Sequence, residues 1–96
     1  MRLTIITADK FVAIDGVGFG GLDLSFIDAS VHAVQWYETH GEIEVKDPAT
    51  GRMVANEVIT SIEAFQPAIA AWQEANIANE ITVANNQPVT TGSQTL

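Results

Sequence analysis

Apolar and polar positions alternate most clearly between residues 31 and 56. In residues 42–46 (EIEVK) two apolar residues lie between charged ones, the period-two pattern of a strand with one buried face. Just before them, Val34 and Trp36 fall on one side of a strand, and His32 is in phase with both. The stretch therefore predicts three antiparallel strands.

Two turn signals separate these three strands. Residues 38–41 (ETHG) predict a hairpin tip, and residues 47–51 (DPATG) predict a second turn. Asp47 can accept hydrogen bonds from the following backbone amides, and Pro48 sets φ for the second turn position. Gly51 tolerates the left-handed conformation that closes such a loop.

The N-terminal residues also predict short strands, at 2–8, 11–14 and 17–19. Between the last two, Asp15 and Gly16 favour a type I′ turn, because both of its central positions need φ > 0. These residues predict a tight hairpin.

The next residues alternate once more before the central strands. Residues 22–26 (LDLSF) predict a further short strand. Ser25 lies three residues before Asp28, a weak capping arrangement, so residues 26–30 predict a single helical turn.

After residue 56 the pattern changes to a helical period. Thr60 and Glu63 fit a capping box, and apolar residues then recur at spacings of four and three, at Phe65, Ile69 and Trp72. We expect this stripe to cover one face of the sheet, because a small sheet needs such cover to be stable. The alternative is that the stripe docks onto a partner protein.

Pro67 interrupts the helical pattern, because it lacks an amide donor and disfavours helical geometry at Gln66. We expect a short turn to end near Phe65 and the main helix to cover residues 67–78. The alternative is a single helix that is kinked at Pro67. Residues 80–84 (EITVA) then predict a brief last strand.

The C-terminal residues 85–96 are polar and uncharged, which is typical of an extended or flexible tail. Within an assembly, part of this tail could add a strand to a neighbour's sheet edge. The division expected is one domain over residues 1–80 and a tail over 81–96. The strand-forming residues of the tail are Val89, Thr90 and Thr91.

Composition narrows the class of protein. The chain has 96 residues, enough for one domain, and 47% of them are apolar. It has no cysteine, which excludes disulfides and thiolate chemistry and fits the cytosol of a host or a virion. No run of apolar residues reaches the length of a membrane span.

The net charge of −8 argues against nucleic-acid binding, because phosphate contacts need Lys and Arg and the chain has only four. None of the four follows Arg52. Solubility is the simplest explanation of the excess acid. The alternative is a surface for a basic partner, although the twelve carboxylates are spread singly along the chain.

Candidate catalytic and cofactor-binding groups do not form a recognisable constellation. The glycine-rich residues 16–21 lack the Lys-Ser/Thr pair and the following helix of a phosphate-binding loop. Thr39 and His40 are neighbours on a turn, where side chains are expected to point apart, and no acid can be assigned to orient the histidine. Glu42 and Glu44 are expected on a solvated strand face. We therefore expect no enzyme activity, cofactor or metal.

Four segments of the chain are specific enough to compare with known proteins. They are the Asp15-Gly16-Val17 turn, the residues 32–36 (HAVQW), the residues 41–44 (GEIE), and Gln66-Pro67 with Ala71-Trp72-Gln73. Together they resemble a group of small proteins of tailed bacteriophages, typically encoded among tail-fibre and baseplate genes. The resemblance covers residues 2–76 and brings no catalytic residue. It implies a virion or virion-assembly protein that acts through protein contacts.

The expectation is an α+β fold, in which about six short antiparallel strands form a meander covered by a C-terminal helix. The expected function is that of a non-enzymatic phage tail-associated protein, either a minor fibre or baseplate subunit or a chaperone of fibre assembly. Its expected partner is a larger tail protein or another copy of itself. The alternative function is an acidic phage inhibitor that binds a basic host protein.

Overall fold

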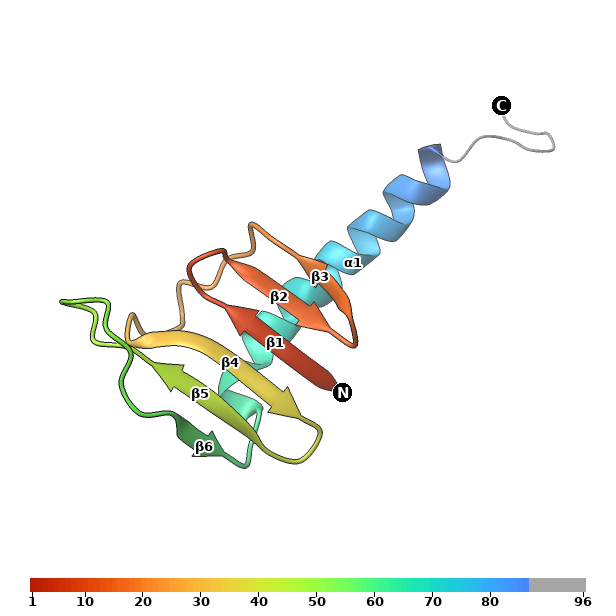
Figure 1. Cartoon of the computed structure of the whole chain (residues 1–96). Coiled ribbons are helices and arrows are strands. Elements are labelled where there is room, and N and C mark those ends of the chain that lie inside the picture. The colour runs from red at the N-terminus through yellow and green to blue at the C-terminus, as the bar shows by residue number, and fades with distance from the viewer. Residues whose placement is uncertain (87–96) are drawn as a thin grey trace.

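The computed structural model describes residues 1–86, with side chains described through Glu80. Six strands form one antiparallel sheet in the order β3-β2-β1-β4-β5-β6, and a C-terminal helix packs on one of its faces (Figure 1). This confirms the predicted α+β fold. The elements are β1 (Arg2–Ile6), β2 (Phe11–Ile14), β3 (Val17–Phe19), β4 (Val31–Tyr37), β5 (Gly41–Val45), β6 (Glu57–Ile59), the 3₁₀ helix η1 (Glu63–Phe65) and α1 (Gln66–Asn86).

The sheet consists of two three-stranded meanders joined through β1 and β4. These two central strands pair antiparallel, with Leu3 opposite Trp36 and Ile5 opposite Val34. In each meander the strands follow one another in sequence outward to an edge, so the sheet edges are β3 and β6. The two edges are therefore formed by segments far apart in the sequence.

The turn between β2 and β3 is the predicted type I′ turn. Asp15 has φ +49° and Gly16 has φ +87°, the positive values that this turn requires. The Asp15 carboxylate also accepts a hydrogen bond of 2.8 Å from the amide of Arg2, while the Asp15 amide donates to the Arg2 carbonyl at 2.9 Å. The turn is thereby bonded to the neighbouring central strand.

A β-bulge near the start of β4 changes which residues face the helix. Ala33 lies opposite Glu44, but Val31 lies opposite Val45, so His32 is the additional residue. The hydroxyl of Thr7 donates to the carbonyls of Val31 and His32 at 2.8 and 3.0 Å. Val31 packs against the core with Val34. The bulge interrupts the regular alternation from which the phase of His32 was predicted.

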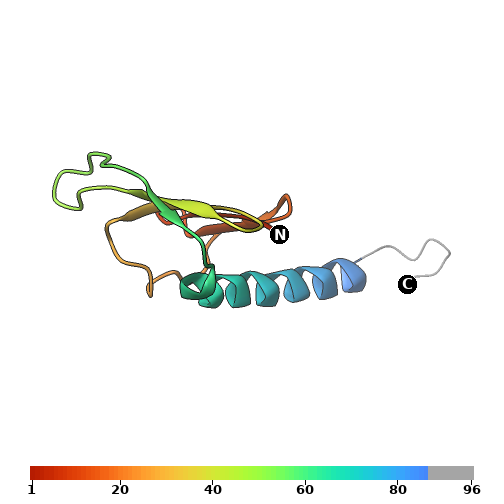
Figure 2. The ribbon, with the colours of Figure 1, turned by 90° about the horizontal axis from the view of Figure 1, so that it is seen from below.

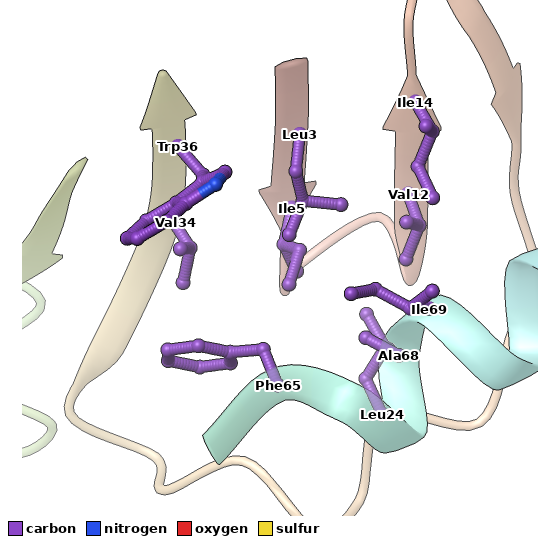
Figure 3. Close-up of a cluster of buried hydrophobic side chains, with 10 residues drawn as sticks. All are labelled: Leu3, Ile5, Val12, Ile14, Leu24, Val34, Trp36, Phe65, Ala68 and Ile69. Carbon is purple, nitrogen blue, oxygen red and sulfur yellow. The ribbon is translucent and has the colours of Figure 1, made fainter. Parts of the chain in front are cut away.

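The hydrophobic core lies between the sheet and the first turns of α1 (Figures 2 and 3). Phe65 at the end of η1 and Ala68 and Ile69 in α1 are buried against the sheet, which confirms that the helix covers it as expected. Full burial of an aliphatic side chain contributes about 1.5–3 kcal/mol each. The other core residues are Leu3, Ile5, Val12, Ile14, Val34 and Trp36 from the sheet and Leu24 from a loop.

The loop between β3 and β4 differs from its prediction. Residues 22–26 form no strand and residues 26–30 form no helical turn. Instead, Asp23 accepts two hydrogen bonds from Ser25, and Asp28 accepts two from Ser30. These Asx turns bend the loop so that Leu24 is buried in the core, while Leu22 and Ile27 pack against the core half-buried.

The last strand of the sheet lies later than expected. Residues 52–56 were predicted as the third strand of the central stretch, but they form only one isolated bridge, Lys46 to Met53, and β6 begins at Glu57. The predicted capping box is also wrong, because the Ser61 hydroxyl, and not that of Thr60, accepts the Glu63 amide at 3.2 Å.

The helix begins where proline predicts and ends later than predicted. η1 ends at Phe65, and α1 starts at Gln66 with Pro67 in its first turn, where a missing amide donor costs no hydrogen bond. Gln66 has helical geometry, with φ −55° and ψ −38°, so the expectation that Pro67 disfavours such geometry there is wrong. α1 then continues to Asn86, so the strand predicted at 80–84 is not formed. Val89, Thr90 and Thr91 of the predicted tail lie outside the described residues.

Candidate protein-interaction surface

The helical stripe divides into a buried part and a half-buried part. Phe65 and Ile69 are 6% and 8% exposed, so a partner could contact them only by displacing the helix. Trp72 is half-buried, and its indole N–H donates a 2.8 Å hydrogen bond to the Val17 carbonyl. Its ring meets Phe19 edge-on with centroids 5.9 Å apart. Trp72 therefore fastens α1 to β3.

Side chains close much of the β3 edge. The Val17 carbonyl accepts the Trp72 indole, and Phe19 packs against the same ring. On the opposite face the Phe11 ring covers Gly18, so that a Cβ at this glycine would lie 2.3 Å from Phe11 Cζ. A strand added at β3 would therefore meet Trp72 of α1 beside Val17.

The β6 edge is open by comparison. β6 pairs with β5 on one side only, and α1 runs away from it toward β3 (Figure 1). Val58, its middle residue, is 74% exposed, the largest value among the exposed large hydrophobic side chains of the described residues. It pairs with Glu42 and therefore lies on the sheet face opposite the helix. An edge strand of this kind can accept another strand.

A projecting hairpin arm leads into this edge. The Asp47 carbonyl accepts the Gly51 amide at 2.7 Å and its carboxylate accepts the Ala49 amide at 2.9 Å, which confirms the turn predicted there. Every residue from 47 to 58 is exposed, and the arm extends beyond the sheet (Figure 2). The arm includes the exposed apolar residues Met53 (50%) and Val54 (57%).

β6 and the neighbouring β5 carry carboxylates, while the basic residues Lys46 and Arg52 lie just before and on the arm. Glu57 lies on β6 and is exposed, and Glu42 lies on the adjoining strand, where it accepts a 3.0 Å hydrogen bond from the Asn56 side chain. Within the described residues neither carboxylate forms an ion pair with a lysine or arginine. The edge therefore combines exposed apolar side chains with carboxylates that lack a cationic partner among these residues.

The centre of the open sheet face is polar and internally bonded. The Arg2 guanidinium lies 4.3 Å from the Tyr37 ring centroid and donates to the Gln35 side chain at 3.1 Å. Thr4 donates to the same Gln35 oxygen at 2.9 Å. The N-terminal amino group contacts Glu38 at the end of β4. These contacts occupy the polar groups of β1 and β4, which makes this region a weaker candidate than the β6 edge.

Two carboxyls in the loop between β3 and β4 have perturbed acidity. Hydrogen bonds from the Ser25 side chain and amide lower the pKa of Asp23, with a smaller contribution from Lys10. The amide and hydroxyl of Ser30 lower the pKa of Asp28 in the same way. Both carboxyls are fully exposed, and their bonds hold the Asx turns of the loop.

The side chains that are capable of catalysis or metal binding do not gather into one site within residues 1–80. The Thr39 hydroxyl lies 3.3 Å from His40 Nδ1, so the expectation that these side chains point apart is wrong, and the His40 ring also lies 5.7 Å from that of Tyr37. Among residues 1–80 no carboxylate is hydrogen-bonded to His40. The described part of the chain holds no group of three His, Cys, Asp or Glu side chains suited to a metal ion.

Comparison with protein-family models, with curated proteins and with solved structures found no match to this chain. Neither helix of the described residues is long and apolar enough to cross a membrane. Among the described residues, the β6 edge with its arm is the strongest candidate for a protein-interaction surface.

Proposed function

We propose that this is a non-enzymatic, phage tail-associated protein that acts through protein contacts. It serves as a minor fibre or baseplate subunit or as a chaperone of tail-fibre assembly, in the virion or in the host cytoplasm. Its partner is a larger tail protein or a further copy of the chain.

The observation that carries the proposal is the gathering of exposed apolar side chains at one sheet edge. Met53, Val54 and Val58 lie within six residues of each other, on the arm and on the strand that it enters. Exposed apolar side chains beside an unpaired strand are a feature of surfaces that bind other proteins.

The resemblance supplies the phage context of the proposal. Its specific pieces fall on the Asp15–Gly16 turn, on β4, on β5 and at the start of α1. These positions shape the sheet and the helix that covers it, so the resemblance supports a common fold among such proteins. The arm at residues 47–54 is not among those pieces, which fits a surface that differs between partners.

Mass spectrometry of purified virions from the phage that encodes the chain tests this function. We expect the protein at a fixed low copy number relative to the major tail protein if it is a subunit. Its absence from virions, with co-purification of a fibre protein from infected cells, would indicate the chaperone. Absence from both would contradict the proposal.

A second candidate function follows from the net charge of −8, namely an acidic inhibitor that binds a basic host protein. The two functions differ in their response to salt. A contact made mainly by charge loses most of its affinity as salt screens it, whereas a contact made by a strand and apolar side chains retains most of its affinity. A salt titration of the isolated complex separates them.

A further inference from the structure

We infer that the β6 edge binds an extended segment of another protein, in which apolar residues alternate with Lys or Arg. The segment adds a strand beside Glu57–Ile59 and so extends the sheet. This inference deepens the proposed function, because it rests on action through protein contacts and names the surface and the chemistry of the partner.

Backbone pairing selects β6 over the other edge. Alternate residues of β6 direct their N–H and C=O groups away from β5, because a strand bonds to its two sides by turns. No element of the described residues lies along that outer side. At β3 the Val17 carbonyl already accepts the Trp72 indole N–H, and the contact between Trp72 and Phe19 fastens the strand to α1.

Val58 sets the apolar position of the partner segment. Its side chain stands on the sheet face that no helix covers, and cross-strand neighbours on one face pack against each other. An apolar residue placed beside Val58 would bury much of a side chain that is now 74% exposed. Met53 and Val54, on the segment that leads into β6, offer further apolar area.

Charge complementarity sets the basic positions. Glu57 lies on the edge strand opposite Ile43, so its side chain is on the other sheet face from Val58. The residues that alternate with the apolar position of the added strand project on that face. Glu57 has no Lys or Arg ion-pair partner among the described residues. A second copy of this chain fits the edge less well, because two chains of charge −8 repel each other and no basic residue follows Arg52.

The test uses the full chain and a fluorescein-labelled synthetic peptide in which valines alternate with lysines and threonines. A peptide of the same sequence with N-methylated amides is the control, because it keeps the side chains and loses the backbone donors. We expect the first peptide to bind, and the second to bind at least about tenfold more weakly, because strand addition relies on main-chain hydrogen bonds. In ¹⁵N-labelled protein the amide shifts should change at residues 57–59 and not at 17–19.

Two matched variants place the contact. Val58→Lys and Val17→Lys make the same substitution at exposed valines of the two edge strands. We expect Val58→Lys to weaken peptide binding about tenfold or more and Val17→Lys to change it less than about twofold, because a charge on an edge strand opposes pairing. Glu57→Gln should weaken binding severalfold and reduce its dependence on salt.

Several outcomes would overturn the inference. Equal binding of the two peptides would mean that the backbone of β6 is not used. Equal losses in Val58→Lys and Val17→Lys would mean that the edge is not selected. Self-association of the wild-type chain that Val58→Lys abolishes would assign the edge to a second copy. If virions contain the protein but Val58→Lys binds peptide normally, the proposed function stands and this docking surface is wrong.

Discussion

At one edge of the sheet the Trp72 indole donates to the Val17 carbonyl and its ring packs against Phe19, while at the other edge Val58 projects into solvent with no covering side chain. Both edges are three-residue strands at the end of a meander. They differ because α1 crosses the sheet in one direction only.

The direction of the helix explains the difference. η1 and the first turn of α1 place Phe65 near Val34 and Trp36, and the helix then runs past β2 and β3 and beyond the sheet (Figures 1 and 3). α1 has 21 residues and is therefore about 30 Å long at 1.5 Å per residue. This length exceeds the width of the half of the sheet that the helix covers. One helix can close one edge, and β6 stays open.

The largest effect is expected at the strand that supports the open edge. A Cβ at Gly41 would lie 2.3 Å from the Gln35 carbonyl oxygen and 3.0 Å from Trp36 Cα, atoms of the backbone that cannot move aside. Gly41→Ala should therefore force β5 away from β4 and destabilise the fold by about 3 kcal/mol or more, measured by urea unfolding.

Gly20→Ala is the matched control for this prediction. The nearest atom to a Cβ at Gly20 is the Asp9 carbonyl oxygen at 3.9 Å, an ordinary contact. We expect its free energy of unfolding to stay within about 0.5 kcal/mol of wild type. Similar values for the two variants would show that β5 can leave its place beside β4 at little cost.

The next effect is expected at the closed edge. Trp72→Ala removes the edge-on contact with Phe19 and the hydrogen bond to Val17, and we expect a loss of about 2–3 kcal/mol, less than for a fully buried tryptophan. Trp72→Phe keeps an aromatic ring and loses the donor, so it should cost about 1 kcal/mol. Urea unfolding followed by circular dichroism measures both.

Trp72→Ala also tests whether the residue has a second role in partner binding. If it lowers stability and leaves the binding of a tail protein intact, Trp72 serves only to fasten the helix. Lost binding in a variant that remains folded at the assay temperature would instead place the partner on α1.

Much smaller effects on stability are expected at the open edge. Val58 is 74% exposed, so Val58→Lys should change the free energy of unfolding by less than about 0.5 kcal/mol. Thermal unfolding followed by circular dichroism checks this value. A loss comparable to that of Trp72→Ala would show that Val58 is covered in solution, and the two edges would then not differ as described.

The features that the sequence predicted correctly are those fixed by neighbouring residues. The type I′ turn depends on Asp15 and Gly16 alone, and the turn at 47–51 depends on Asp47 and Gly51. Similarly, Pro67 marked the start of the helix, because a residue without an amide donor is tolerated in the first turn of a helix and not in its interior.

The structural features that the sequence pattern did not predict depend on contacts between distant segments. The bulge at His32 is held by Thr7, which follows β1, and the delay of β6 to Glu57 follows from the arm that precedes it. The alternation at 22–26 was misread because Asx turns produce the same spacing. The open edge of β6 had no signal in the sequence, since edge position is a property of the whole sheet.

The smallest effect concerns the loop that leaves the closed edge and returns to the sheet centre. Hydrogen bonds from Ser25 lower the pKa of Asp23 below its ordinary value of 3.8. Because the folded state has the lower pKa, the ionised carboxylate stabilises the fold above pH 3.8, and this contribution is lost as the pH falls through the lower folded value.

Asp23→Ala should therefore be slightly less stable than wild type near pH 7, and the difference should shrink in acid as the wild-type carboxyl is protonated. The effect is small because the carboxyl is fully exposed and water screens it. Parallel thermal unfolding of both proteins from pH 7 down to pH 3 measures it. A difference that persists unchanged in acid would assign the role of Asp23 to its neutral hydrogen bonds, and the loop would then hold its turn whether or not the carboxyl is charged.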